Sequence, residues 1–256
     1  MAWAETTSLS FTARHEAGQA DDALAVLESL EAYRERLEGL FPRVPGNVTV
    51  LLHDSWLQLA LAQPYLPLAR RLASPVSRRY MTGWFAAGEV HCLAPEGLRA
   101  GAGGPDSLEA LLLTPEHTYT MLVVGTNNAL LPPPFRPRTL RILRRSGWVL
   151  DGAGQYFSGQ VPLLRAAIAI RLRQGTVPFP PRFRDAPIVA GALFDVLARE
   201  RGVDACVRLA RQPTRDATAV LESAFDLPSA EIAGLWRAHL ERLSAASPKV
   251  SILTDQ

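Results

Sequence analysis

The chain of 256 residues contains few cysteines, few aromatic residues and no large excess of either charge. Its two cysteines, Cys92 and Cys206, lie far apart in apolar segments. No CxxC pair is therefore present to bind zinc, and we expect two buried free thiols. The net charge of +2 and the 20% content of charged residues do not indicate a nucleic-acid-binding protein. The densest basic run, Arg141–Arg145, is interpreted as a solvated helix face.

Long hydrophobic runs are also lacking. Arg, Gln or Pro interrupts each apolar stretch before it reaches the roughly 20 residues of a membrane span. The first 11 residues have no basic region followed by an apolar region, which is the pattern of a signal peptide. We therefore expect a soluble, cytoplasmic chain with no membrane partner.

Several catalytic motifs are absent. The sequence has no G-x-S-x-G, and its glycine-rich segment 96–106 lacks the Lys-Ser/Thr pair of a phosphate-binding loop. A Cys92 nucleophile has little support, because its neighbour His91 points to the opposite face of a strand. No two histidines are spaced i,i+4. Serine hydrolases and P-loop proteins are therefore excluded.

The segments that look like strands are confined to the first hundred residues. Alternation of apolar and polar residues predicts a strand over 8–15, and β-branched residues predict another over 47–54. Residues 80–95 are typical of a hairpin that turns near Gly88. Residues 20–41 have the periodicity of an amphipathic helix, and helical periodicity dominates after residue 105.

This order of elements predicts an α+β fold. We expect an N-terminal mixed α/β part with a small sheet over residues 1–131 and an all-helical part over residues 132–256. The helix near residue 115 should restart at Pro115, because proline removes a helical hydrogen bond.

Two segments suggest chemistry. The first is PEHTY, Pro115–Tyr119, in an apolar helix, and the second is WVLDGAGQYF, Trp148–Phe157. Together they resemble the gluzincin metallopeptidases of the peptidase MA-like group. Those enzymes carry H-E-x-x-H on one helix and a downstream W-L-x-E-G-x-A-x-Y-F, whose Glu is the third zinc ligand. The resemblance implies a zincin-like fold and extends over most of the chain.

The resemblance also implies roles for single residues. It places Glu116 at the general base, Pro115 and Tyr119 at the two ligand histidines, and Asp151 at the ligand glutamate. Proline offers no ligand atom, and the phenol of tyrosine has a pKa of about 10. Catalytic zinc usually has three protein ligands. We therefore expect a vestigial general base at Glu116 and no metal cofactor, with zinc as the alternative.

The same residues also have explanations without chemistry. Thr114 can cap the helix, with Pro115 at its first position and Glu116 complementing the helix dipole. Asp151 can cap a short helix of its own. Tyr119 is expected to fill the former metal space, with its hydroxyl hydrogen-bonded to Glu116 or Asp151.

We expect a cleft between the two parts, formed by the strand of His91, the helix of Glu116 and the helix of Asp151. His91, His117 and Tyr156 are the expected cleft-lining residues. A rebuilt site made of His91, Glu116 and Asp151 is a further alternative.

The function predicted from the sequence is that of an inactive metallopeptidase homologue, a pseudoenzyme that binds a peptide or a protein partner in the former cleft. Two alternatives stay open. One is an active metal-dependent peptidase with a rearranged metal site, and the other is a purely structural or assembly protein. Metal content would distinguish the active peptidase from the pseudoenzyme. An open, apolar cleft would distinguish the pseudoenzyme from a structural protein.

Overall fold

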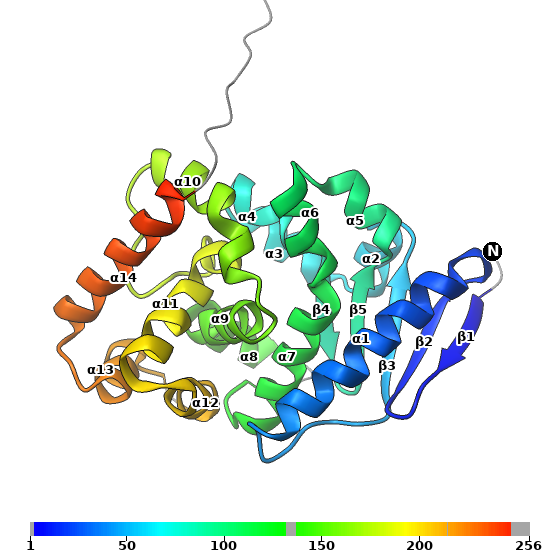
Figure 1. Ribbon diagram of the computed structural model, residues 1–256, viewed down its shortest axis with the longest axis horizontal. Helices are drawn as coiled ribbons and strands as arrows, with labels where there is room; N and C mark the ends of the chain where they lie inside the picture. Colours follow the sequence, from blue (N-terminus) through cyan, green and yellow to red (C-terminus); the bar gives the residue numbers. More distant parts are fainter. Residues whose placement is uncertain (1–2, 132–136, 214, 247–256) are drawn as a thin grey trace, which may run out of the picture.

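The computed structural model describes residues 3–131, 137–213 and 215–246. It has an N-terminal part built around a sheet, and helices follow it in the chain (Figure 1). The fold is α+β, as predicted. The boundary expected after residue 131 falls at residues 132–136, outside the described residues.

A five-stranded mixed sheet forms the N-terminal part. The strands are β1 (Trp3–Thr7), β2 (Phe11–Glu16), β3 (Val48–His53), β4 (Gly83–Ala86) and β5 (Glu89–Leu93). Their order is β1-β2-β3-β5-β4, so β1 and β4 are the edge strands. The central pairs β2–β3 and β3–β5 are parallel, and both edge strands pair antiparallel. β1 was not predicted from the sequence.

Helices make up most of the remaining chain. Near the sheet lie α1 (Ala20–Glu38), α2 (Trp56–Ala62), α3 (Tyr65–Leu72), α4 (Pro75–Arg79), α5 (Pro95–Gly101), α6 (Pro105–Leu112) and α7 (Thr114–Asn127). The later helices are α8 (Pro137–Ser146), α9 (Trp148–Phe157), α10 (Arg165–Arg173), α11 (Ala186–Arg201), α12 (Val203–Arg211), α13 (Ala217–Phe225) and α14 (Ser229–Ala245). Short 3₁₀ turns, η1 (Ala17–Gln19) and η2 (Val161–Leu164), precede α1 and α10.

Local sequence accounts for most of these boundaries. The predicted hairpin forms between β4 and β5, where Gly88 adopts a φ of 73° at the turn. The predicted helix restart is confirmed, because α6 ends at Leu112 and α7 begins at Thr114. Most of the glycine-rich segment 96–106 is helical. Residues Pro95–Gly101 form α5, with proline in its first turn and an acidic residue after it.

Helices α1 and α7 pack on the sheet, α1 against β1 and β2 and α7 against β4 and β5. Helix α9 lies between α7 and α11 and contacts both (Figure 1). One hydrophobic core runs from Phe11 in β2 to Leu240 in α14, so the sheet and the later helices share buried side chains. The sheet part is therefore joined to the helical part through α7 and α9.

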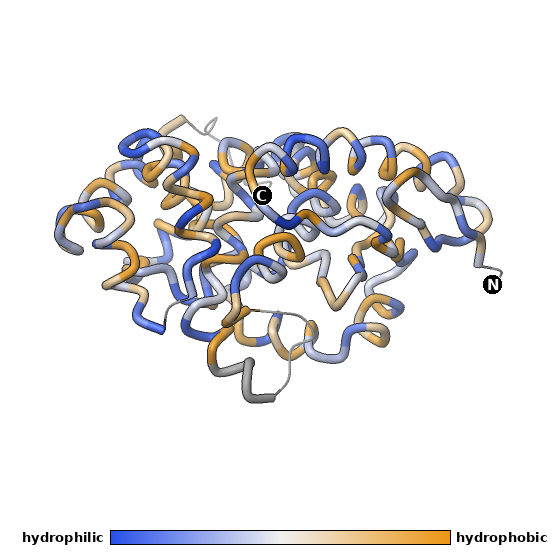
Figure 2. Tube along the Cα trace, turned by 90° about the horizontal axis from the view of Figure 1, so that it is seen from below, coloured by the Kyte–Doolittle hydropathy of each residue, from blue (hydrophilic) through white to orange (hydrophobic). Residues whose placement is uncertain are grey.

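Hydrophobic and hydrophilic segments alternate along the helices (Figure 2). Among the described residues, no helix is long and apolar enough to cross a membrane.

Candidate functional site

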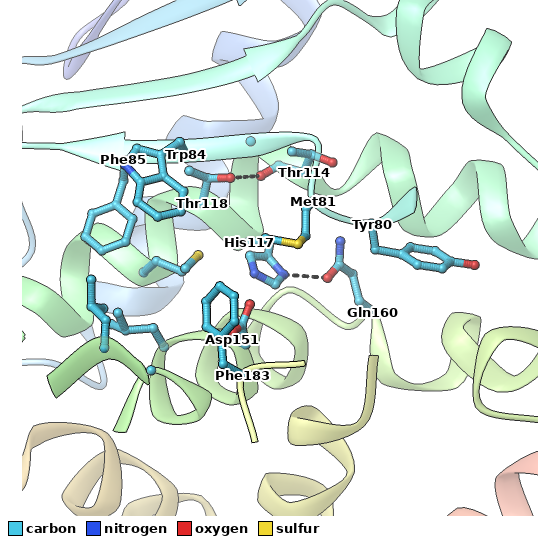
Figure 3. A pocket seen from close by; sticks show the side chains of 15 residues that line it. Tyr80, Met81, Trp84, Phe85, Thr114, His117, Thr118, Asp151, Gln160 and Phe183 are labelled. Carbon is cyan, nitrogen blue, oxygen red and sulfur yellow. Dashed lines mark hydrogen bonds between the residues drawn. The ribbon is translucent and has the colours of Figure 1, made fainter. Parts of the chain in front are cut away.

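A small pocket of about 60 Å³ lies where the edge strand β4 meets helices α7 and α9 (Figure 3). Its walls come from β4 and the residues before it, from α7, from α8 and α9, and from two loop residues. The lining residues are Tyr80, Met81, Gly83, Trp84, Phe85, Thr114, His117, Thr118, Met121, Leu143, Gly147, Leu150, Asp151, Gln160 and Phe183. The pocket therefore joins the sheet to the helical part. Its strand is β4, whereas the sequence suggested β5, the strand of His91.

One face of α7 lines this pocket. Thr114, His117, Thr118 and Met121 are spaced i, i+3, i+4 and i+7, which places them on one side of a helix. An α-helix turns by about 100° per residue, so Glu116 points to nearly the opposite side from Thr118. The helix thus presents His117, rather than Glu116, to α9.

Two glycines allow the elements to approach closely. A Cβ atom at Gly83 would lie 2.5 Å from the Thr118 hydroxyl oxygen, so β4 lies directly against α7. A Cβ atom at Gly154 would lie 2.8 Å from His117 Nε2, so the imidazole lies directly against α9. These contacts hold the pocket narrow and fix the position of the ring.

The hydrogen bonds of His117 define its tautomer. The amide nitrogen of Gln160 donates to the Ala110 carbonyl at 2.7 Å, which orients the amide oxygen toward His117. His117 Nδ1–H donates to that oxygen at 2.6 Å, so Nε2 carries the lone pair. Burial lowers the pKa of His117 to about 4, and the imidazole is neutral at pH 7.

Asp151 lies on α9 and faces the same pocket (Figure 3). Its carboxyl group is half-buried and accepts no hydrogen bond from any described residue. Burial raises the pKa of Asp151 to about 7. Asp151 is the fourth residue of α9, whose N-cap is Gly147, so the cap role predicted for Asp151 was wrong.

Glu116 and Pro115 lie outside this pocket. Together they line a groove between α1 and α5. The Ser29 hydroxyl donates to Glu116 Oε1, whereas the buried Oε2 has no partner among the described residues. Burial raises the pKa of Glu116 above its ordinary value. The prediction that Glu116 faces the cleft with Asp151 was wrong, because the rotation of the helix turns it toward α1.

Tyr119 is part of the packed core. Its ring meets Phe11 edge to face at 5.1 Å, and its side chain is fully buried. The hydroxyl donates to the Pro45 carbonyl at 2.5 Å. The predicted hydrogen bond to Glu116 or Asp151 was therefore wrong. The predicted cap at Thr114 was also wrong, because Leu113 is the N-cap of α7 and the Thr114 hydroxyl donates to Leu111.

His91 lies away from the pocket. Its ring stacks on His53, with 5.3 Å between centroids, and Nδ1 lies 3.0 Å from His53 Nε2. Gln63 and Glu89 approach its other ring nitrogen. Burial lowers the pKa of both histidines, to about 4 for His53. The predicted cleft-lining role of His91 and its cluster with Glu116 and Asp151 were both wrong.

Tyr156 does not line the pocket either. Its ring packs against Phe157 at 5.0 Å and Phe194 at 6.4 Å, on the side of α9 that faces α11. Of the predicted cleft-lining residues, His117 alone lies in the pocket, together with Asp151. Thr118 and Met121 were not predicted from the sequence, although Met121 follows His117 at i+4 and Thr118 follows Thr114 at i+4. The sequence analysis also missed Gln160, for which the sequence held no signal.

The pocket residues do not fit a catalytic zinc ion. Zinc usually takes three protein ligands, and the pocket presents one imidazole, at His117, and one carboxylate, at Asp151. Met121 adds a soft thioether, which suits copper(I) better than zinc. Over the described ranges, no group of three or more His, Cys, Asp or Glu residues is placed to hold a metal.

Thr118 also lines the pocket and offers no general base. Its hydroxyl donates to the Thr114 carbonyl at 2.7 Å, and a neutral hydroxyl does not take a proton from water near pH 7.

Comparisons with protein-family models, with curated proteins and with solved structures found no match for this chain.

Proposed function

We propose that this chain is a zincin-like metallopeptidase homologue without peptidase activity, and that it binds an extended peptide segment of a partner protein between β4, α7 and α9. One observation carries the proposal. The edge strand β4, His117 on α7 and Asp151 on α9 border a single pocket. The gluzincin resemblance implies this combination of elements around a zinc ion.

The pocket residues support a different alignment of α7 with the H-E-x-x-H motif. The helix positions that face Asp151 are His117, Thr118 and Met121. They take the places of the first histidine, the glutamate and the second histidine of H-E-x-x-H, two residues later than PEHTY suggests. One ligand position is then retained at His117, and Asp151 keeps a carboxylate at the third.

Peptide binding is supported by the position of β4 in the sheet. Gly83, Trp84 and Phe85 of this edge strand line the pocket. Edge strands offer backbone groups to an added peptide strand, and neighbouring pockets select its side chains.

Restoring H-E-x-x-H at positions 117–121 tests this alignment of α7 with the zincin-like motif. We expect the variant Thr118→Glu/Met121→His to retain near-stoichiometric zinc after dialysis, measured by elemental mass spectrometry. The matched control is Thr118→Glu/Met121→Ala, which has the base but no second imidazole and should retain none. If a folded Thr118→Glu/Met121→His protein held no more zinc than this control, the proposed register would be rejected.

Peptide binding needs its own measurement. We expect some members of a pooled library of fluorescent extended peptides to bind the wild-type protein, detected by fluorescence anisotropy. Met121→Trp fills the pocket from α7 and should abolish that binding while the fold persists. Equal binding by wild type and Met121→Trp would place the peptide elsewhere on the molecule.

A further inference from the structure

A second cavity, an open groove of about 860 Å³, is bordered by five arginines. They come from three segments that are distant in the sequence. Arg144 and Arg145 end α8, Arg182 and Arg184 belong to the loop before α11, and Arg215 precedes α13. All five are exposed. The basic run at the end of α8 is therefore one side of a larger basic groove, rather than an isolated solvated face.

Among the described residues, these arginines form no ion pair with a carboxylate. Six other arginines lie within 4.0 Å of a carboxylate, namely Arg14, Arg34, Arg165, Arg171, Arg199 and Arg201. None of the five groove arginines makes such an ion pair with a described carboxylate. Asp216, the acidic residue of the groove, caps α13 by accepting from the backbone N–H groups of Thr218 and Ala219. Asp185, next to Arg184, forms a buried ion pair with Arg171.

The lining of this groove has an excess of positive charge. Its lining carries five positive charges and one negative charge, a formal net charge of +4. The whole chain has a net charge of +2, so the remaining residues together have a net charge of −2. Charge of one sign gathered along a groove attracts ligands of the opposite sign.

The backbone that carries Arg182 and Arg184 is well fixed. The Ser74 N–H donates to the Arg184 carbonyl at 2.9 Å, and the Asp185 N–H donates to the Arg182 carbonyl at 2.9 Å. Phe179 packs on Trp236 at 5.6 Å, and Pro180 and Pro181 add further rigidity. A fixed backbone lowers the conformational entropy lost when a ligand binds.

We propose that this groove binds an acidic segment of a partner protein, with Asp or Glu carboxylates accepting paired hydrogen bonds from the guanidinium groups. Guanidinium and carboxylate groups match in planar, two-point contacts. The arginines stand on three segments around an open groove, so a ligand that contacts all of them carries several anionic groups. The groove stands apart from peptide binding beside β4 and does not depend on it, although Phe183 lines both cavities.

An acidic peptide fits better than a nucleic acid. The basic surface is confined to one groove, and the rest of the molecule has a net negative charge that repels a long phosphate backbone. The sequence pI of about 8.7 also lies below the range above 9 that is usual for nucleic-acid-binding domains.

The probe for the test is a fluorescein-labelled peptide of ten residues in which Glu and Ala alternate, measured by fluorescence anisotropy at low salt. We expect saturable binding that weakens as salt is added, and no binding of the same peptide with Gln in place of Glu. Arg182→Gln/Arg215→Gln should weaken binding by about tenfold or more, because hydrogen bonds between charged groups are lost.

The matched control removes two charges outside the groove. Arg208 and Arg237 are exposed on α12 and α14, and neither lines the groove. Arg208→Gln/Arg237→Gln should change the affinity less than twofold, and circular dichroism checks that both variants fold. Three results would each overturn the proposal: no binding by wild type, equal loss in the two variants, or tighter binding of a ten-nucleotide oligouridine than of the Glu peptide. The zinc and library experiments are unaffected by any of these results.

Discussion

The two faces of α7 differ in how completely their polar groups are satisfied and packed. Toward α1 and the sheet, Tyr119 is fully buried, and its hydroxyl has a fixed carbonyl acceptor. Toward α9, His117 and Met121 are only partly buried and border an open space, with one imidazole nitrogen unused. The face of α7 with Glu116 and Tyr119, which the sequence suggested as the functional face, is thus largely structural. The face with unused polar atoms is the one suited to a ligand.

Glu116 is the exception on the structural face. Its Oε2 atom is buried without a partner, and Oε1 accepts from Ser29. Asp151 is the corresponding carboxyl on the pocket side, with a pKa raised by burial to about 7. The comparison teaches that a carboxyl with a raised pKa need not belong to the site. Whether such a carboxyl belongs to the site depends on its position relative to the pocket.

The largest expected difference between the two faces concerns cavity formation. Tyr119→Ala should lower the free energy of unfolding by about 4 kcal/mol, because it empties a fully buried aromatic position. Met121→Ala, on the pocket face, should cost only about 1 kcal/mol, since that side chain already borders open space. Urea unfolding followed by circular dichroism measures both. Equal losses would contradict the assignment of the two faces.

The next expected effect is a pH dependence that comes from Asp151. The folded-state pKa of about 7 lies above the ordinary value of 3.8, so the folded protein holds this proton to higher pH than the unfolded chain does. Stability from this group is complete below the unfolded pKa and is lost as the pH rises toward 7. Between pH 5 and 8 the loss should be about 2 kcal/mol, reduced from the full linkage value by partial exposure.

Asp151→Asn cannot ionise, so it should remove this loss. The variant should be more stable than wild type at pH 8, and the difference should be smaller at pH 5, by urea unfolding at both values. The same slope with pH in variant and wild type would show that the pKa of Asp151 is not raised.

The contact between His117 and α9 gives a smaller effect. Gly154→Ala places a methyl group against the imidazole, which Gln160 holds in place. We expect a loss of roughly 1 to 2 kcal/mol from overpacking. His117→Ala should remove most of that cost in the double variant, and a double-mutant cycle measures the coupling. Additive losses would mean that the ring is free to move aside.

The smallest expected effect concerns Glu116. Glu116→Gln keeps the shape of the side chain and removes a charge that burial disfavours. Because the folded pKa is raised, wild type should lose stability as the pH rises above the ordinary Glu range, and the variant should not. At pH 8 we expect Glu116→Gln to be about 1 kcal/mol more stable, by thermal unfolding. A destabilised Glu116→Gln would mean that the carboxylate is partnered.

The elements themselves were largely predictable. Periodicity located α1 and indicated that helices dominate after residue 105, alternation located β2, and β-branched residues located β3. Proline and glycine marked where α7 restarts and where the β4–β5 hairpin turns. Such features depend on neighbours within a few residues. β1 was missed because Trp3–Thr7 is short and gains its stability by pairing with β2.

The site was only partly predictable. His117 and Asp151 were both singled out, yet the sequence placed Glu116, Tyr119 and Tyr156 with them. A shift of two residues along a helix turns a side chain by about 200°, and periodicity alone does not say which face meets α9. The residues that contact one face of a helix come from elements distant in the chain. Gln160, which accepts a hydrogen bond from His117, is an example.

The sequence by itself determined the order of strands and helices, because hydrophobic periodicity and the backbone limits of proline and glycine act locally. Tertiary structure alone decided that β4 forms the edge beside α7 and that His117 shares a pocket with Asp151. It also decided that arginines from three segments border one groove. These results depend on how helices rotate and pack against the sheet, and the packing of the whole core sets that rotation.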